Sequence, residues 1–233
     1  MLRELVLDTE TTGFKPEEGH RIVEIGAVEL INHVPTGNVY HQYINPERDM
    51  PIEAFNVHGL SEQFLRGHPV FADIADAFLE FISDGVLVIH NAAFDMAFIN
   101  AELSYLKVSP VPDEQVLDTL AIARRKHPMG PNSLDALCRR YGVDNSGRTK
   151  HGALLDSELL ADVYVELIGG RQHGLEIDPV SQIETKTEAV RRTATHGQRP
   201  VPLKSRLTDD EKNAHNEFVD SLSGEALWQR YSN

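Results

Sequence analysis

The chain has 233 residues, in which 36 acidic residues outweigh 22 lysines and arginines and give a formal charge of −14. Hydrophobic residues make up 41% of the sequence, which is enough for a core and excludes a wholly disordered chain. No clean apolar run is longer than that of residues 86–89, which is far shorter than the roughly 20 residues of a membrane span. The acidic balance argues against coating nucleic acid or an anionic membrane by bulk electrostatics, but it allows a small local site for a phosphate ester.

The single cysteine, Cys138, excludes a disulfide within the chain and predicts a reducing compartment. The first residues carry Arg3, Glu4 and Asp8 within an apolar stretch, and this is not the pattern of a signal peptide. We therefore expect a cytoplasmic protein.

Short apolar segments near the start of the chain predict three strands. Residues 4–8 read as a short buried strand that ends in an acid, residues 22–30 as a longer strand, and residues 39–44 as a weaker one. The short loops between these segments favour antiparallel neighbours.

The chain then mixes helical and strand patterns. Apolar residues at helical spacing predict an amphipathic helix over 71–82, and residues 86–89 predict a buried strand. Asn91 is the expected N-cap of a helix that runs to about Leu106. Three further helices are expected, at residues 117–126, 133–141 and 153–168, the last stopped by Gly169 and Gly170. Strands first, then strands and helices together, predict a layered α/β or α+β domain over residues 1–170.

The composition changes after residue 170. Prolines, hydroxyl residues and a lack of periodicity predict a flexible linker over residues 171–206. Residues 207–233 form a tail that begins with a capping box, Thr208 followed three residues later by Glu211, and continues with apolar residues at helical spacing. Residues 181–206 carry a net charge of +4 and the tail −4, so the whole −14 belongs to residues 1–180.

Two acids lie two positions apart at the end of the first strand. Asp8 and Glu10 would project from the same face, because side chains alternate along a strand. Two solvated acids at a strand end are common, and taken alone a functional role and this ordinary one are equally good readings.

Three more residues follow predicted elements at positions where sites often form. Asp95 lies one turn into the helix after the buried strand, although an acid there also simply complements the helix dipole. His151 and Asp156 bracket the start of the long helix, and a separation of five residues cannot place both on one helical face. If the two cooperate, His151 must reach over from the preceding loop; otherwise they are a loop histidine and a helix-surface acid.

Four carboxylates and one histidine together would define a particular chemistry. Gathered carboxylates repel one another and raise some of their pKa values, and divalent cations relieve that repulsion. Oxygen ligands suit Mg²⁺ or Mn²⁺ rather than zinc, and two such cations are the usual device for attack of water on a phosphodiester. The histidine would then remove a proton from that water.

Three segments carry a family resemblance. D-T-E-T-T-G, H-N-A-A-F-D and H-G-A-L-L-D resemble, in order, the three motifs of the DEDDh 3′→5′ exonucleases. Within that family, the chain is most similar to the proofreading subunits of bacterial replicative DNA polymerases, nearly continuously over residues 1–170 and again in the tail. The resemblance implies a ribonuclease-H-like fold with a mixed central sheet, and hydrolysis of single-stranded or mismatched DNA 3′ ends that releases 5′-mononucleotides.

The resemblance also implies roles for single residues. It makes the four acids ligands of two divalent cations, Mg²⁺ or Mn²⁺, and His151 the general base; the acids, of which the first two would also contact the substrate, are Asp8, Glu10, Asp95 and Asp156. Glu53 and His58 match positions that contact the terminal nucleotide, although from the residues alone they read only as a short helix and turn. Thr11, Thr12 and Asn91 are expected near the site, but turn or capping roles account for them equally well.

Partners are expected along the C-terminal part. The resemblance implies that residues 207–233 bind the polymerase (alpha) subunit, and residues 172–177 are a weak match to a sliding-clamp-binding peptide that is equally consistent with plain linker sequence. An RNA 3′-exonuclease of the same family would have identical catalytic motifs, and a non-catalytic bridging subunit would share the tail. The intact set of acids argues against the second alternative.

Overall fold

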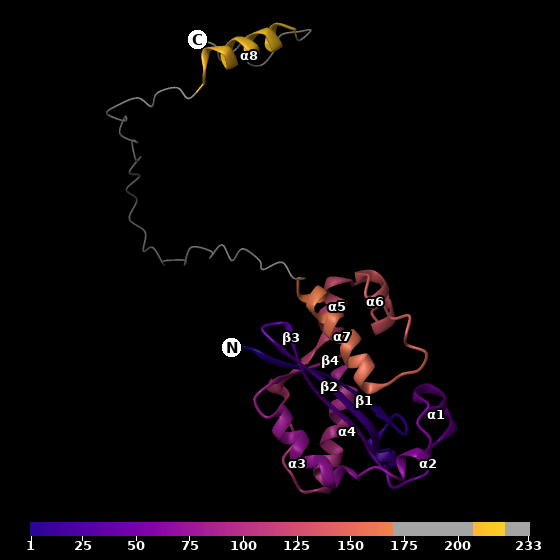
Figure 1. Ribbon diagram of the computed structural model, residues 1–233. Coiled ribbons are helices and arrows are strands. Elements are labelled where there is room, and N and C mark those ends of the chain that lie inside the picture. The colour runs from indigo at the N-terminus through magenta and orange to yellow at the C-terminus, as the bar shows by residue number, and fades with distance from the viewer. Residues whose placement is uncertain (170–206, 222–233) are drawn as a thin grey trace, which may run out of the picture. The chain divides into compact units, whose positions relative to one another are not determined.

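The structure is a computed structural model that describes residues 1–169 and 207–221 (Figure 1). The chain divides into two units, Met1–Ile177 and Asp178–Asn233. The predicted linker and clamp-binding peptide, and the end of the tail, lie outside the described residues. Among the helices of the described parts, none is both long and apolar enough to cross a membrane.

A five-stranded mixed sheet forms the centre of the first unit, with strand order β3-β2-β1-β4-β5. The first three strands pair antiparallel, whereas β4 runs parallel to both β1 and β5. The strands span β1 Arg3–Thr11, β2 Ile22–Ile31, β3 Val34–Tyr43, β4 Val86–Ile89 and β5 Val116–Asp118. The structure therefore agrees with the expected mixed sheet and antiparallel neighbours, and it extends the first strand three residues beyond Asp8.

Helices cover both faces of this sheet. The helices of the first unit are α1 Ile52–His58, α2 Glu62–Leu65, α3 Phe71–Ile82, α4 Ala92–Tyr105, α5 Thr119–Lys126, α6 Leu134–Tyr141 and α7 Ala153–Ile168. Short 3₁₀ turns occupy Pro16–Glu18 and Asp113–Gln115. The predicted helix over 71–82 and the one over 153–168 have the expected bounds, because strong apolar periodicity and a following glycine specify them.

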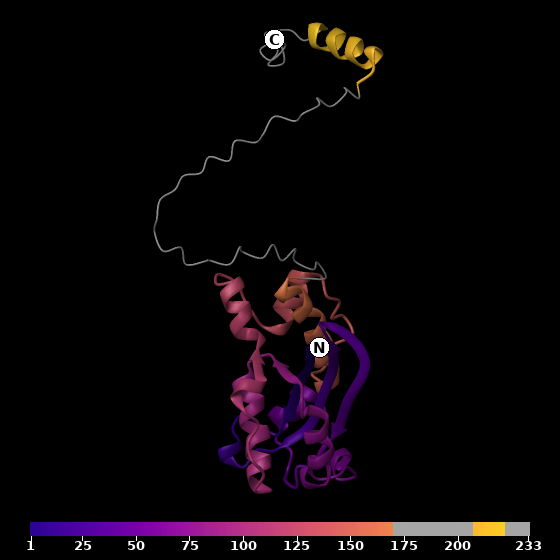
Figure 2. The ribbon, with the colours of Figure 1, turned by 90° about the vertical axis from the view of Figure 1, so that its left-hand side faces the viewer.

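The alternation of β1 side chains divides the core into two layers. Leu5 and Leu7 pack with Phe78 of α3 and Phe98 of α4. Val6, from the opposite face of β1, packs with residues of α7, and α5 and α6 pack against the outer side of α7. The course of these helices relative to the strands can be followed in Figures 1 and 2. Each fully buried side chain of this size contributes roughly 1.5–3 kcal/mol, so both layers hold α4 and α7 firmly on the sheet.

The prediction of a helix over residues 117–126 is wrong about where the helix begins. Residues 116–118 form β5, which pairs parallel with β4, and the helix begins only at Thr119. Asp118 caps that helix by accepting a hydrogen bond from the backbone N–H of Leu120 at 2.8 Å. Pairing with the neighbouring strand thus overrides the apolar spacing that made these residues look helical.

Helix α7 approaches the sheet closely at Gly26 of β2. A Cβ atom at this position would lie 2.2 Å from the backbone nitrogen of Leu154, so only glycine allows the helix to come so near. The Ser157 hydroxyl donates a hydrogen bond of 2.9 Å to the Gly26 carbonyl. Gly26 is also the residue opposite Asp8 in the β1–β2 ladder. The first turn of α7 is thereby held beside the acidic end of β1.

The second unit contains helix α8, Asp209–Ser221, with the predicted capping box at its start. The Thr208 hydroxyl accepts from the Glu211 backbone N–H at 3.3 Å, and the Glu211 carboxylate accepts from the Thr208 backbone N–H at 2.8 Å. This reciprocal pair satisfies two backbone donors that would otherwise lack partners.

Replacing Gly26 with alanine tests how the sheet positions α7. We expect Gly26→Ala to cost about 3 kcal/mol of unfolding free energy, because the methyl group must displace the helix backbone. Urea denaturation followed by circular dichroism measures this loss. Gly147→Ala is the matched control, since a Cβ there meets no atom within 4 Å. Equal stability of the two variants would contradict the close approach.

Candidate active site

Asp8 and Glu10 project from the same face of β1, as their spacing predicts. Val6, two residues earlier on that face, packs against α7, so both acids point toward the side of the sheet that α7 covers. Glu10 is buried, and Asp8 is partly buried. Across the β1–β2 ladder, Glu10 faces Glu24, a third acid on this part of the sheet.

Asp95 reaches the same edge of the sheet from the first turn of α4. Because β4 runs parallel to β1, the helix that follows β4 starts beside the carboxyl end of β1. The Thr9 backbone N–H and hydroxyl donate to one Asp95 carboxylate oxygen at 3.0 and 2.7 Å. Asn91 occupies the predicted N-cap position, but it adopts a left-handed conformation and its side chain makes no capping hydrogen bond.

His151 and Asp156 meet in the way that their spacing demands. His151 lies in the loop before α7, whereas Asp156 projects from the first turn of the helix. The His151 Nδ1 atom is 3.3 Å from an Asp156 carboxylate oxygen, and the His151 backbone N–H donates to the Val57 carbonyl at 3.3 Å. Ligand atoms of Glu10, His151 and Asp156 all lie within 4.8 Å of one another. Strand β1 and the start of α7, which are distant in the sequence, therefore converge at one point.

Burial and mutual repulsion raise the pKa values of three of the acids. Burial, together with the charges of Asp95, Glu10 and Asp156, raises the pKa of Asp8 well above its ordinary value. Burial and the neighbouring acids raise the pKa of Glu10 to about 8. Burial also raises the pKa of Asp95, although the hydrogen bonds from Thr9 oppose it. The protein alone therefore supplies too little positive charge to favour the ionised form of these acids at pH 7.

Asp156 behaves differently because the Arg148 guanidinium pairs with it. Burial raises its pKa, but the contacts with His151 and Arg148 outweigh burial and hold the pKa below the ordinary value. Arg148 donates from Nε and Nη2 to the two carboxylate oxygens at 2.5 and 2.6 Å, in a bidentate pair.

The donor set fits divalent cations. It consists of carboxylate oxygens that lack a sufficient counter-charge, with one imidazole at the edge, and hard cations such as Mg²⁺ prefer oxygen ligands. Added positive charge would relieve the repulsion that raises the pKa values of Asp8 and Glu10.

The two predicted substrate-binding residues belong to α1. His58 is buried, its Nδ1 accepts from the Leu60 backbone N–H at 3.0 Å, and its Nε2 has no hydrogen-bond partner among the described residues. Burial, with the nearby charges of His151 and Lys150, lowers the pKa of His58 to about 4, so the ring is neutral at pH 7. Glu53 is exposed in the first turn of α1. Lys150 donates to the carbonyl of Asn56, so the loop that carries His151 contacts α1.

Thr11 and Thr12 make the turn contacts that their ordinary reading predicts. The Thr11 hydroxyl donates to the Gly13 carbonyl at 2.6 Å, and the Thr12 hydroxyl accepts from the Arg21 backbone N–H at 3.0 Å. Both threonines are buried next to Glu10 in the chain.

Sequence reasoning did not identify two residues of this site, Arg148 and Glu24. Glu24 is buried opposite Glu10, and it lies 2.7 Å from the Nε2 atom of His41. An acid inside the apolar run Ile22-Val23-Glu24-Ile25 is the signal that could have revealed it. Arg148 is a single cation three residues before His151, and nothing in the local pattern distinguishes it from the other arginines.

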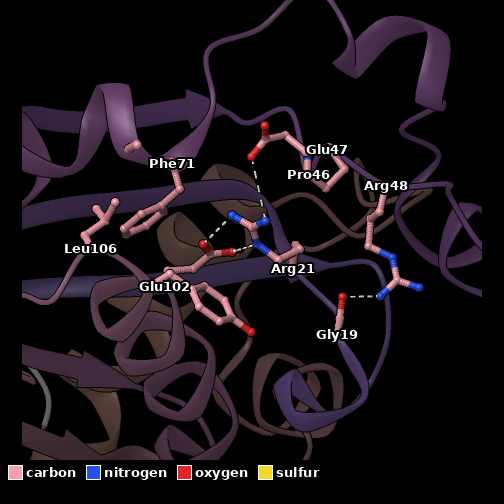
Figure 3. Close-up of a pocket in the computed structure, with 10 residues that line it drawn as sticks. Gly19, Arg21, Pro46, Glu47, Arg48, Phe71, Glu102 and Leu106 are labelled. Carbon is pink, nitrogen blue, oxygen red and sulfur yellow. Dashed lines mark hydrogen bonds and ion pairs between the residues drawn. The ribbon is translucent and has the colours of Figure 1, made fainter.

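A separate pocket lies away from the four acids (Figure 3). It encloses about 440 Å³ and includes Arg21, Glu47, Arg48 and Glu102 in its lining. Arg21 donates two hydrogen bonds of 2.8 Å to the buried Glu102 carboxylate, and Glu47 lies 3.8 Å from the same guanidinium. The positive charge of Arg21 is thus already paired, and the pocket contains none of the predicted catalytic residues.

Comparison with known proteins identifies the family of this chain. The family model described as Exonuclease matches residues 5–164. The epsilon subunit of DNA polymerase III from Rickettsia felis is 50% identical, with 95% of this chain and 97% of the relative covered. The same subunit from Escherichia coli is 44% identical, with 97% of each chain covered. The chain therefore belongs to the exonuclease family and, within it, to the family of DNA polymerase III epsilon subunits.

Solved structures agree with this placement. Exonuclease X in complex with 5′ overhanging duplex DNA aligns with a TM-score of 0.56 and 25% identity, over 72% of this chain and 91% of that chain. The nuclease domain of 3′hExo, a DEDDh family member bound to rAMP, aligns with a TM-score of 0.62 and 18% identity, over 71% of this chain and 91% of that one. These likenesses confirm the ribonuclease-H-like exonuclease fold, and the family confirms the expected class, a 3′→5′ proofreading exonuclease. Exonucleases of the DEDDh type depend on metal ions.

The raised pKa of Glu10 predicts how stability depends on pH without metal. Between its ordinary pKa and about 8, the folded chain holds a proton that the unfolded chain has released, so stability falls as pH rises from 6.5 to 8. Each unit of pKa shift corresponds to about 1.4 kcal/mol. Urea denaturation in EDTA at both pH values measures the loss, which should be smaller in Glu10→Gln. Identical pH dependence in the two proteins would contradict the assignment.

Proposed function

We propose that the chain hydrolyses the 3′-terminal phosphodiester of single-stranded or mismatched DNA ends and releases 5′-mononucleotides. Asp8, Glu10, Asp95 and Asp156 hold two divalent cations, Mg²⁺ or Mn²⁺, and His151 is the general base. One observation carries this proposal: donor atoms of Glu10, His151 and Asp156 from β1, a loop and α7 lie within 4.8 Å of one another.

Each residue has a task in this reaction. The cations, when bound, neutralise the crowded carboxylates and the scissile phosphate and lower the pKa of the attacking water. Asp95 is held for its ligand role by Thr9, which fixes one carboxylate oxygen and leaves the other available. His151 is about half exposed, with a relative side-chain exposure of 49%, so its ring can accept a proton from water at the mouth of the site.

The terminal nucleotide binds between the acids and α1 in this proposal. Asp8 and Glu10 would contact the end together with the cations that they would hold, and Glu53 and His58 would contact the terminal nucleotide. The unpartnered Nε2 atom of the buried His58 supports this role, because a buried polar atom without a partner is costly unless a ligand completes it.

We infer partners for the parts of the chain on either side of the linker. Residues 1–170 act as the exonuclease domain, 171–206 as a linker with a clamp-binding peptide at 172–177, and 207–233 as the segment that binds the polymerase (alpha) subunit. The relatives named as subunits of DNA polymerase III support a place in a replicative complex that works in the cytoplasm. The exposed Phe218 on the capped helix α8 supports docking of the tail onto a partner.

A 3′-mismatched DNA primer tests the metal-ligand assignment. With Mg²⁺, the wild-type chain should release mononucleotides, and EDTA should stop the release. Asp156→Asn should leave less than about 1% of the activity, because a ligand of the cations is lost. Asp162→Asn, an exposed acid on the same helix, is the matched control and should retain full activity. Undiminished hydrolysis by Asp156→Asn would refute the assignment, and equal rates on a matched RNA strand would refute the preference for DNA.

Single-turnover kinetics test the role of His151. His151→Gln should slow the chemical step by roughly 10²–10⁴-fold while the dissociation constant for the primer changes little, because the proton acceptor is lost and the binding surface is kept. Rapid quench measures the step, and fluorescence anisotropy in Ca²⁺ measures primer binding. An unchanged single-turnover rate would rule out the base role.

A further inference from the structure

Arg148 is the cation most deeply embedded in the site. Its side chain is only 8% exposed, and it lies in the loop between α6 and α7. Its guanidinium donates to both oxygens of Asp156, to Asp135 at 2.8 Å and to His151 Nδ1 at 2.8 Å. Arg148 therefore contacts both Asp156, a proposed metal ligand, and His151, the proposed base.

A carboxylate that is bidentate to a guanidinium has little capacity left for a metal ion. Arg148 supplies the positive charge that Asp156 needs when no divalent cation is bound. A cation that binds between Glu10 and Asp156 would lie close to this guanidinium, and like charges at short range repel. Arg148 and a divalent cation are therefore competitors for Asp156.

The contact with His151 has a second consequence. A guanidinium donates hydrogen bonds and accepts none, so Nδ1 of His151 must be the acceptor while Arg148 holds it. The proton of the neutral ring is then on Nε2, which cannot accept another. Once Arg148 leaves, Nδ1 can carry the proton and donate to Asp156, 3.3 Å away, and Nε2 becomes free to act as a base.

The Arg148 guanidinium also has a second carboxylate partner, Asp135. Asp135 on α6 accepts from Nη1 of Arg148, and Asn145 of the same loop donates to Asp135 at 3.0 Å. Arg148 can thus release Asp156 and His151 and keep its bond to Asp135, without unfolding of the loop.

We propose that Arg148 is a built-in counter-cation that keeps the metal-free site in a resting state, in which it pairs with Asp156 and holds His151 in the tautomer protonated at Nε2. Divalent cations displace it, and this frees both the ligand and the base. The inference rests on the metal site of the proposed function, and it adds a competitor that lowers the affinity of that site.

Binding of Mn²⁺ to the full-length chain tests this competition without any measurement of activity. Free Mn²⁺, followed by its electron paramagnetic resonance signal, gives the dissociation constant. Arg148→Gln should bind Mn²⁺ about tenfold more tightly than wild type, because the competing charge is gone. Arg139→Gln, an exposed arginine on α6, makes the same change in net charge and should leave the affinity unchanged. Arg148→Lys, which keeps the charge but cannot form the bidentate pair, should have an affinity between those of wild type and Arg148→Gln.

Thermal melting provides a second measurement. In EDTA, Arg148→Gln should melt at a lower temperature than wild type, because Asp156 loses its buried counter-charge, and saturating Mn²⁺ should close that gap. For the tautomer, ¹⁵N spectra of His151 should change from protonated Nε2 to protonated Nδ1 when Mg²⁺ is added.

The outcomes separate this inference from the metal site itself. Equal or weaker Mn²⁺ binding by Arg148→Gln, or a melting gap that Mn²⁺ leaves unchanged, would overturn the competition and make Arg148 only a structural residue. If wild type binds no Mn²⁺, or Asp156→Asn binds it as well as wild type, the proposed metal site fails and the inference fails with it.

Discussion

Repulsion among carboxylates is the constraint on which this molecule depends. Asp8, Glu10 and Asp95 are brought together at the carboxyl end of β1 and β4, where burial raises their pKa values, and the fold provides no lysine or arginine beside them apart from Arg148 among the described residues. Such a cluster costs folding free energy. The rest of the domain supplies it, through two apolar layers that fix α4 on one face of the sheet and α7 on the other.

Local patterns specified much of the fold. Helices α3 and α7 have the bounds that apolar periodicity predicts, and the alternation along β1 placed Asp8 and Glu10 on one face correctly. The pattern failed at residues 116–118, because pairing with β4 is a tertiary contact that no local spacing records. Arg148 escaped notice for the same reason: its importance comes from Asp135 and Asp156, on two different helices, and from no motif of its own.

The convergence of the site was predictable only in part. The five-residue separation of His151 and Asp156 correctly required the histidine to approach from the loop, since a helix could not place both together. The close approach of α7 to the sheet was not predictable, because it depends on the missing side chain of Gly26, and a glycine within a strand can equally mark a bulge or a bend. Sequence thus identified the reacting groups, and packing decided how they meet.

The two hydrogen bonds from Thr9 to Asp95 have a consequence for substitutions that preserve shape. Both Thr9 groups donate to the same oxygen of Asp95. An asparagine at this position could accept both hydrogen bonds only if its side-chain carbonyl faced Thr9. Its amide group would then point at the remaining acids and present hydrogens where a lone pair stood. The fold would accept the exchange without strain, while the site would gain two donors among carboxylates. Asp95→Asn would therefore leave the packing unchanged and still oppose cation binding, because its amide hydrogens carry partial positive charge.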